Sequence, residues 1–397
     1  MSSFVVELPS ALEEDLAGEV AKQAMFASPG VRVFDWDDTG RCARVTVDPG
    51  ADPAEVESKV RRLVAGMVRR HRPIPRKVIR TSARRDPEPM VAHVERALEE
   101  RGFLRELGPG QIALAGPPLA FARALDARLS KLARERFGAR EEAYPALIPT
   151  DVLHRCGYLA SFPNNASMVS HLVEDVDVLE RFREANRGAP ALSIPEPAAV
   201  VLAAACLAPA VCYHLYPALA GARLAQPLVV TALGRCFRYE SRNMRGLERL
   251  WDFEMREVIF CGAEPATRAR RAELVELAAR EAEGLDLTFT IENATDPFFS
   301  ADYAQKTFWQ AKSDLKLELR LALPPDDRGR ARATAAASFN LHEDFFGRTF
   351  SFATEDGAPA FTGCAAWGLA RWVLAAFTQH GLSPARWPAE WRREVFS

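Results

Sequence analysis

The residues best suited to chemistry lie in one stretch, GRCFRYESRNMRGLERLWDFEMREV at 234–258. It holds six arginines and five acidic residues between two apolar runs, although the formal net charge of the whole chain is only −2. Side chains alternate between the two faces of a strand, so Cys236, Arg238 and Glu240 would share one face. On the strand that follows, the same rule would align Phe253, Met255, Glu257, Ile259 and Cys261.

Two antiparallel strands joined by an arginine-rich loop suit a bound polyphosphate. The loop carries Arg242, Arg245 and Arg249, and a guanidinium fork matches the oxygens of a phosphate group. Phe253 could stack on a nucleotide base, and Glu240 could accept a hydrogen bond from an exocyclic amine. A ligand-free lattice of cross-strand ion pairs explains the same composition equally well. The residues alone leave both interpretations open.

The order of several motifs favours a nucleotide site. FRYE at 237–240, followed by a loop and RLWDF at 249–253, resembles motif 2 of class II aminoacyl-tRNA synthetases, particularly the seryl branch. TGCAAWGLAR at 362–371 resembles motif 3, and Tyr144–Pro163 resembles the segment after motif 1. This resemblance, over about residues 85–390, implies an α+β class II fold. We therefore expect an antiparallel sheet flanked by helices, in a homodimer formed through motif 1.

At the matching positions, the resemblance implies an ATP site. Arg238 would hold the α-phosphate, Glu240 would lie on the adenine side, and Phe253 would stack on the adenine. Arg371 would contact the γ-phosphate, and Arg249 is a further candidate for a phosphate contact. The implied reaction is attack of an amino-acid carboxylate on the α-phosphate, which gives an aminoacyl adenylate and pyrophosphate. Arg238, Glu240 and Arg371 are the candidate catalytic residues, because this chemistry depends on neutralising and placing anions.

Three departures from the seryl branch redirect the expected substrate. The N-terminus lacks a helical hairpin with heptads. Cys212 occupies the glutamate position of that branch's T-x-E segment, and Cys364 follows Gly363 in motif 3. Together with Glu257, these cysteines resemble the zinc ligands of amino acid:[carrier protein] ligases, truncated homologues of the atypical zinc-dependent seryl-tRNA synthetases. Cys212, Glu257 and Cys364 would leave a fourth tetrahedral position open for the substrate amino group.

That ligase family uses ATP to activate a small amino acid and transfers it to the phosphopantetheine thiol of an acyl or peptidyl carrier protein. The resemblance implies glycine or alanine as substrate, Zn²⁺ and Mg²⁺ as cofactors, and no role for tRNA. Asp296 and Asn340 are the candidate substrate contacts, and a strand-end cap is the alternative role for Asp296. Ala335 lies near the sequence position at which seryl enzymes have a carboxylate that binds magnesium. Glu318 or Glu343 is therefore expected to bind Mg²⁺ in this chain.

Two other functions fit parts of the sequence. An atypical seryl-type aminoacyl-tRNA synthetase would need a basic face on residues 1–85 to bind tRNA. A non-catalytic paralogue would bind nucleotide without turnover. Ala335 is its main support, and Ala370 replaces the glutamate that commonly precedes the motif 3 arginine. The retained Arg238 and Arg371 argue against an inactive protein.

The overall composition limits the alternatives. The chain has 397 residues, of which 48% are hydrophobic and 26% charged, as in a globular protein of two or three domains. Its small net charge gives no reason to expect broad capture of nucleic acid or of an anionic membrane. The sequence suggests neither a signal peptide nor a run of 18 apolar residues, so we expect a cytoplasmic protein. The seven cysteines lack the spacing of a disulfide framework.

Hydrophobic periodicity divides the chain into two parts. Residues 1–80 are predicted to form a small α/β accessory domain, and residues 85–397 the class II synthetase-like catalytic domain. The charged run at 72–85 between them is expected to be a linker, with binding of nucleic acid as the alternative. The accessory domain should contain two helices and two strands, at 10–25, 31–36, 43–47 and 53–70.

In the catalytic domain, strands that follow one another without regular βαβ spacing favour an antiparallel sheet. Strands are expected at 141–149, 227–233, 253–261, 288–292 and 315–323. Helices are expected at 89–101, 118–137, within 165–186, at 266–283, and finally from about Cys364 to His380.

Overall fold

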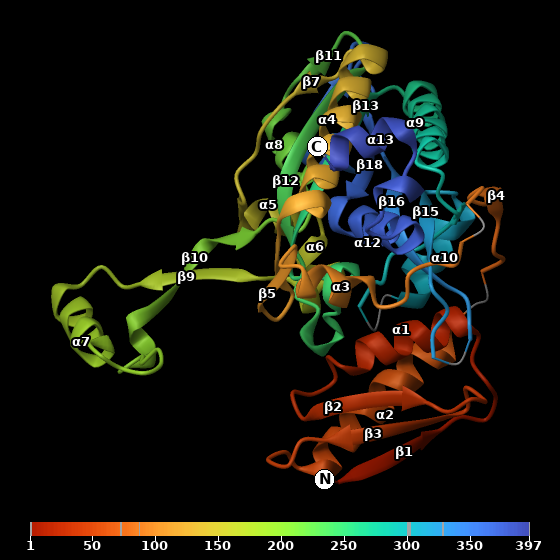
Figure 1. Cartoon of the computed structure of the whole chain (residues 1–397). Helices are drawn as coiled ribbons and strands as arrows, with labels where there is room; N and C mark the ends of the chain where they lie inside the picture. Colours follow the sequence, from red (N-terminus) through yellow and green to blue (C-terminus); the bar gives the residue numbers. More distant parts are fainter. Residues whose placement is uncertain (1, 72–73, 87, 300–302, 328, 397) are drawn as a thin grey trace.

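A computed structural model describes residues 2–71, 74–86, 88–299, 303–327 and 329–396. Its centre is an eight-stranded sheet in the order β4-β14-β15-β16-β18-β13-β12-β7, antiparallel except for the β12–β7 pair (Figure 1). In sheet order, the strands are β4 (Val78–Ser82), β14 (Phe289–Asn293), β15 (Lys316–Leu323), β16 (Arg332–Glu343), β18 (Phe361–Gly368), β13 (Asp252–Gly262), β12 (Leu228–Phe237) and β7 (Arg140–Glu141). The predicted α+β antiparallel sheet flanked by helices is confirmed.

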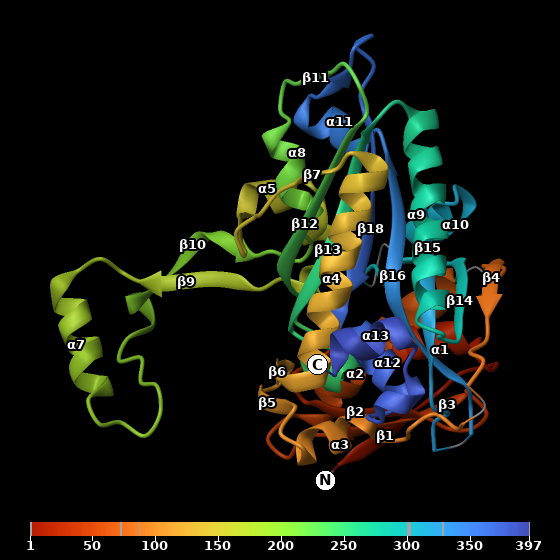
Figure 2. The ribbon, with the colours of Figure 1, turned by 45° about the horizontal axis from the view of Figure 1, so that its top comes forward.

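Long helices cover one face of the sheet: α4 (Gly116–Phe137), α9 (Glu264–Gly284), α12 (Leu369–His380) and α13 (Ala389–Val395) (Figure 2). Helix α12 is mostly apolar and almost entirely buried, as expected for a helix enclosed between a sheet and other helices. Its Phe377 packs edge-on against Trp387, with the ring centroids 4.9 Å apart. Burial of these large aromatic rings supplies much of the hydrophobic stabilisation of this layer.

Shorter elements cover the opposite face. They are α5 (Thr150–Arg155), α6 (Tyr158–Ser161), η3 (Cys212–His214), α8 (Leu215–Ala218) and α11 (Phe345–Phe350). The strand pair β11 (Arg223–Leu224) and β17 (Ala353–Thr354) lies beside them, and helix α10 (Tyr303–Lys312) precedes β15. The side chains of β13 alternate between the two layers, because Val258 and Phe260 pack with the long helices while Ile259 and Cys261 pack with the short ones.

Residues 2–71, here called the N-terminal unit, have their own sheet and core. Strands β1 (Ser3–Glu7), β3 (Cys42–Val47) and β2 (Val31–Trp36) pack against helices α1 (Glu14–Ala24) and α2 (Pro53–Arg70). The predicted start of α2 is right, since Asp52 caps the helix by accepting a hydrogen bond from the backbone N–H of Ala54 at 2.9 Å. Helix α1 begins later than predicted, and β1 was not predicted. The proposed boundary of a separate domain stays a prediction.

The structure corrects the linker prediction for residues 72–85. Val78–Ser82 form the edge strand β4, hydrogen-bonded to β14 of the large sheet. Arg80 forms ion pairs with Glu276 and Glu283 at 2.8 and 2.6 Å, so this basic side chain stabilises the sheet edge. Val78 and Ile79 are both exposed, and the sequence therefore lacks the alternation by which a half-buried strand is recognised.

A two-stranded arm projects from the body in both views (Figures 1 and 2). It consists of β9 (Met168–Leu172), α7 (Val176–Asn186) and β10 (Val200–Leu207), and β10 also pairs with β8 (Leu147–Pro149). The single helix predicted within 165–186 is therefore wrong for its first part. Helix α7 begins only after Asp175, whose carboxylate accepts hydrogen bonds from two backbone N–H groups of the first turn.

The last predicted helix also starts too early. Cys364 lies in the middle of β18, and α12 begins at Leu369. The remaining elements are α3 (Val94–Glu100), the hairpin of β5 (Leu104–Gly108) and β6 (Gln111–Leu114), and short turns of 3-10 helix. In the described ranges, every helix is too short or too polar to cross a membrane.

Candidate active site

A cavity of about 280 Å³ opens between the short-element layer and the sheet. Every site residue predicted from the sequence lines it, although the roles of these residues stay predictions: Cys212, Arg238, Glu240, Arg249, Phe253, Glu257, Asp296, Glu318, Asn340, Cys364 and Arg371. They come from six separate elements and their connections. The residues of β13 that line the cavity are Phe253, Met255 and Glu257, as the alternation predicts.

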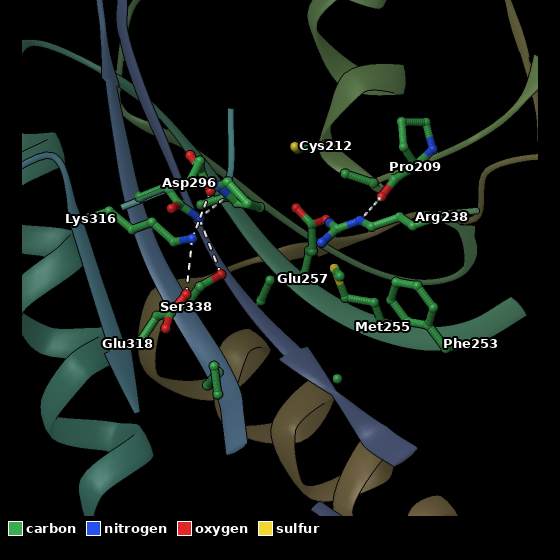
Figure 3. Close-up of a pocket in the computed structure, with 18 of the residues that line it drawn as sticks. Pro209, Cys212, Arg238, Phe253, Met255, Glu257, Asp296, Lys316, Glu318 and Ser338 are labelled. Carbon is green, nitrogen blue, oxygen red and sulfur yellow. Dashed lines mark hydrogen bonds and ion pairs between the residues drawn. The ribbon is translucent and has the colours of Figure 1, made fainter. Parts of the chain in front are cut away.

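Arg238 and Glu240 lie just beyond the strand on which they were predicted. Strand β12 ends at Phe237, so the expected common face of Cys236, Arg238 and Glu240 is wrong. Arg238 Nε donates a hydrogen bond to the carbonyl oxygen of Pro209 at 3.0 Å (Figure 3). Its guanidinium carbon lies 5.6 Å from the centroid of the Phe253 ring. The strand end thus places a cation beside an aromatic face at one end of the cavity.

Of the three loop arginines, only Arg249 borders the cavity. Arg242 forms an ion pair with Asp48 of the N-terminal unit, and Arg245 lies 3.6 Å from the Glu248 carboxylate. Fewer loop arginines are therefore placed to bind a polyphosphate in this cavity than the composition of the loop suggested. Arg249 forms an ion pair with Glu240 at 3.4 Å, and both side chains line the cavity.

Arg371 completes the cationic wall from the first turn of α12. Its guanidinium donates hydrogen bonds to the carbonyl oxygens of Glu248 and Ala335, each at 2.8 Å. Burial, and then the nearby charges of Arg249 and Arg238, lower the pKa of Arg371 from its usual value. Three arginines around one cavity repel one another, and an anion bound between them would relieve that repulsion.

Lys316 is a functional candidate that the sequence interpretation missed. Its ammonium lies 2.6 Å from the Asp296 carboxylate and 3.0 Å from the Glu318 carboxylate (Figure 3). Gln310 also donates to Asp296, at 2.6 Å. A signal was present, because Lys316 and Glu318 are two residues apart on β15 and so share the face that lines the cavity. Asp296 is thus part of a charge network and does more than cap a strand.

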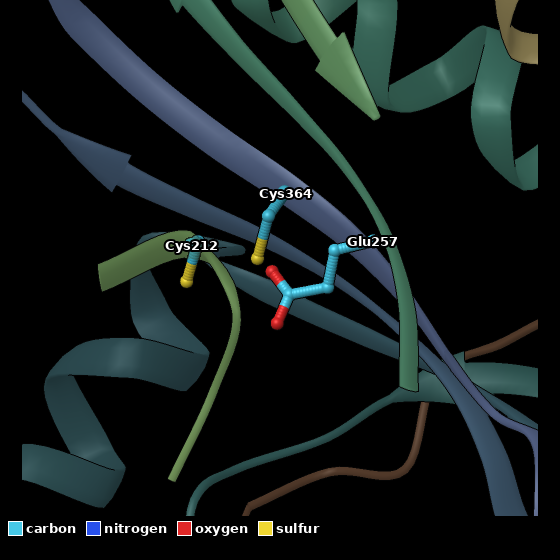
Figure 4. A group of neighbouring side chains, drawn as sticks. All are labelled: Cys212, Glu257 and Cys364. Atoms are coloured by element: carbon cyan, nitrogen blue, oxygen red, sulfur yellow. The ribbon is translucent and has the colours of Figure 1, made fainter. Parts of the chain in front are cut away.

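Cys212, Glu257 and Cys364 line the cavity and point toward one another, as Figure 4 shows. All three are buried, and their possible ligand atoms lie within 4.8 Å of one another. Glu257 Oε1 accepts a hydrogen bond from the backbone N–H of Val211 at 2.9 Å. Glu257 Oε2 is buried and has no hydrogen-bond partner among the described residues, which is unusual for a carboxylate oxygen.

Burial and close packing shift the pKa values of this triplet. Burial raises the pKa of Glu257 to about 8, and the neighbouring Cys364 adds to that shift. A hydrogen bond from the Cys212 thiol lowers the pKa of Cys364 well below its usual value. Three anion-forming groups packed this closely suit a divalent metal. Thiolate and carboxylate donors are ligands that Zn²⁺ accepts, so the residues present fit the predicted zinc site.

Asn340 and His342 surround Cys364 from strand β16. Asn340 Nδ2 donates to Cys364 Sγ at 3.5 Å, and His342 Nε2 lies 3.9 Å from the same sulfur. The other ring nitrogen of His342 lies 3.2 Å from the hydroxyl of Thr362. A second histidine, His214, lies outside the site: its ring stacks on Tyr144, and neither of these two residues lines the cavity. Of the two magnesium candidates, Glu318 borders the cavity and Glu343 does not.

Similar proteins identify the family. A model of the tRNA synthetase class II core domain (G, H, P, S and T) matches residues 205–380, which carry the cationic wall and the triplet. Over 252 residues, the chain is 36% identical to amino acid–[acyl-carrier-protein] ligase 2 of Bradyrhizobium diazoefficiens, covering 62% of this chain and 71% of that protein. The chain belongs to the amino acid–[acyl-carrier-protein] ligase family. It is therefore a ligase, and the family predicted from its motifs is confirmed.

More distant relatives of this ligase show the fold. It is 28% identical over 312 residues to the type-2 serine–tRNA ligase of Methanopyrus kandleri, covering 72% of this chain and 57% of that protein. A crystal structure of M. kandleri SerRS in complex with A. aeolicus tRNASec matches with a TM-score of 0.70 at 23% identity, covering 99% of this chain and 77% of that chain. The predicted class II synthetase fold is confirmed.

Proposed function

We propose that this ligase is a zinc-dependent enzyme that activates glycine or alanine with ATP and transfers it to the phosphopantetheine thiol of an acyl or peptidyl carrier protein. One observation carries the proposal. The buried triplet of Cys212, Glu257 and Cys364 lies in the same cavity as the arginines. The proposed site for a free amine and the proposed site for a polyphosphate thus share one cavity, as formation of an aminoacyl adenylate requires.

The arginines would act on the nucleotide. Arg238 is fixed by Pro209 and would neutralise charge on the α-phosphate as the carboxylate approaches, while the neighbouring Phe253 ring would stack on the adenine. Arg371 uses two of its nitrogens in hydrogen bonds to the carbonyl oxygens of Glu248 and Ala335, and its other N–H groups would bind the γ-phosphate. Glu318 is the proposed ligand for Mg²⁺, since it borders the cavity.

The triplet would fix the amino end of the substrate. A zinc ion held by Cys212, Glu257 and Cys364 would offer its fourth coordination position to the substrate amino group. Asn340 donates to Cys364 Sγ and would hold this ligand in place, while Asp296 lines the neighbouring wall as a proposed substrate contact. Tyr213 and Phe346 also line the cavity, and their bulk supports a small amino acid as substrate.

Two group transfers would follow. A carboxylate oxygen of the amino acid forms a bond to the α-phosphorus of ATP while the bond to the β-phosphate oxygen breaks, and pyrophosphate leaves. The thiol sulfur of the carrier then bonds to the carbonyl carbon of the adenylate while the C–O bond to AMP breaks. The products are a thioester, AMP and one proton. We further propose that the enzyme is a cytoplasmic homodimer with a separate accessory domain at residues 1–80.

Amino-acid-dependent pyrophosphate exchange on zinc-loaded protein tests the proposal. We expect exchange with glycine or alanine, loss of that signal in Cys212→Ala, and little change in the control Cys156→Ala. Cys156 is also buried, but it does not line the cavity. Exchange with serine alone would favour an aminoacyl-tRNA synthetase. No exchange with any of the twenty amino acids would favour a non-catalytic paralogue, and mass spectrometry of a loaded carrier protein would test the second transfer.

A further inference from the structure

The N-terminal unit, at the bottom of Figure 1, forms hydrogen bonds with two segments that lead into the cavity. One is the short helix η4 (Ser241–Asn243), which directly follows Glu240. The other is the connection after β14 that carries Asp296 and Phe298. Glu240 and Asp296 both line the cavity, so each of the two contacted segments carries part of its wall.

The first contact holds η4. Asn243 Nδ2 donates a hydrogen bond to the carbonyl oxygen of Lys22 in α1 at 2.9 Å, and the neighbouring Arg242 is paired with Asp48. The backbone N–H of Asn243 also bonds to the carbonyl oxygen of Glu240 at 2.9 Å. A displacement of η4 would therefore be passed directly to Glu240.

The second contact holds the part of the wall that carries Asp296. Gln23 Nε2 donates to the carbonyl oxygen of Phe298 at 2.8 Å and to Glu19 Oε1 at 3.1 Å. Gln23 and Glu19 are only 3% and 8% exposed, so this amide is a buried, oriented group. The backbone N–H of Phe298 bonds to the carbonyl oxygen of Asp296 at 2.9 Å, and the Phe298 ring stacks on Phe162, which lines the cavity.

Lys22 and Gln23 are consecutive residues in the last turn of α1. One turn of helix thus connects the wall that carries Glu240 with the wall that carries Asp296. We propose that this turn is a clamp that sets the spacing of the two walls, and that the N-terminal unit thereby tightens binding of ATP and of the amino acid. Lys22, Gln23 and Asn243 are positioning residues, because their effect passes through Glu240 and Asp296. The identity of the two ligands rests on the proposed function.

Small polar contacts of this kind are typical of domains that move relative to one another. If the clamp and the ligands favour the same spacing of the walls, each must strengthen the other, because coupling between sites is reciprocal. ATP should therefore protect the 241–243 and 294–299 segments from hydrogen exchange. Loss of the clamp should weaken ATP binding and leave the arginines in place.

The test compares Asn243→Ala and Gln23→Ala with the control Glu55→Gln, which breaks an exposed ion pair with Lys59 on α2. We expect both clamp variants to weaken binding of a non-hydrolysable ATP analogue, measured by calorimetry, by at least about fivefold. They should also raise the KM values more than they lower kcat, and increase deuterium uptake at 241–243 and 294–299. The control should match the wild type.

Unchanged affinity and uptake in both clamp variants would overturn the proposal. Gln23 is buried, so a Gln23→Ala protein could fail to fold, but Asn243→Ala leaves α1 intact and keeps the test decisive. Calorimetry and hydrogen exchange also separate the two claims. A wild type without exchange activity for any amino acid would refute the proposed function, whereas the clamp would still be judged by ATP-analogue affinity and deuterium uptake.

Discussion

Replacement of Lys316 by Met should destabilise the fold strongly for a single substitution. Its ammonium is 2.6 Å from Asp296 and 3.0 Å from Glu318, and each attraction is about 6 kcal/mol at an effective dielectric constant of 20. Most of that gain offsets the cost of desolvating the three charges. Removing one partner of a buried ion pair typically costs about 3–5 kcal/mol, because the remaining charge loses its compensation.

The exposed fractions place the expected cost at the lower end of that range. The side chains of Lys316, Asp296 and Glu318 are 9%, 32% and 19% exposed, so water would partly solvate the two carboxylates left behind. We therefore expect a loss of about 3 kcal/mol in the free energy of unfolding, or roughly 4 °C in Tm for a chain of this length. The control Lys131→Met removes an exposed partner of Glu135 and should cost less than about 1 kcal/mol.

The loss should depend on pH in a defined direction. Burial opposes ionisation of Asp296, but Lys316 and Gln310 hold the pKa of this carboxyl below its usual value. Burial likewise opposes the charged form of Lys316, but Asp296 and Glu318 hold its pKa above the usual value. The carboxyl contributes stability above pH 4 or so and loses it as pH falls, while the ammonium contributes below pH 10 or so and loses it as pH rises. The deficit of the variant should be largest in between.

Urea unfolding of the wild type and of Lys316→Met at pH 7 and at pH 3.5 measures this deficit. A triple variant, Lys316→Met with Asp296→Asn and Glu318→Gln, should regain most of the stability, because it leaves no unpaired charge. A deficit below about 1 kcal/mol at pH 7, or one that grows on acidification, would refute the reasoning. So would a triple variant less stable than the single one.

Three further changes have defined outcomes. Arg371→Lys should raise the KM for ATP by about tenfold or more, because an ammonium cannot replace the guanidinium that reaches Glu248 while binding phosphate. Chelation of zinc should lower the Tm of the wild type but not that of Cys212→Ser, because a metal bound only to the folded state stabilises it by mass action. Gly363→Ala should cost about 1–3 kcal/mol, since an added Cβ would lie 2.6 Å from the Asn340 carbonyl oxygen and collide with the Phe260 ring.

Each of these outcomes has a clear opposite. An unchanged KM in Arg371→Lys would remove this residue from the phosphate site. Equal chelator effects on both proteins, or less than one zinc ion per chain by elemental analysis, would argue against the triplet as a metal site. A Gly363→Ala protein of wild-type stability in urea would mean that strands β16 and β18 separate readily at this point.

Local patterns predicted much of the site. Alternation along Phe253, Met255 and Glu257 placed three residues on one face of β13, and the structure has them lining the cavity. Such patterns depend only on the twofold periodicity of a strand, which is written in consecutive residues. The resemblance to known motifs supplied the remaining candidate site residues. It also predicted the family, which similar proteins confirm. It also placed Cys212 and Cys364 together although 152 positions separate them (364 − 212).

Tertiary structure alone decided the contacts between distant segments. Strand β4 exists because its backbone pairs with β14, and its exposed side chains give no period that could predict it. Lys316 becomes a buried cation only because the Asp296 segment folds over it, and Gln23 becomes part of a clamp only because α1 lies against Phe298. These contacts depend on how whole elements pack, whereas a sequence pattern records only the period within each element. The sequence by itself thus predicted which residues line the cavity, and packing decided which other residues hold them in place.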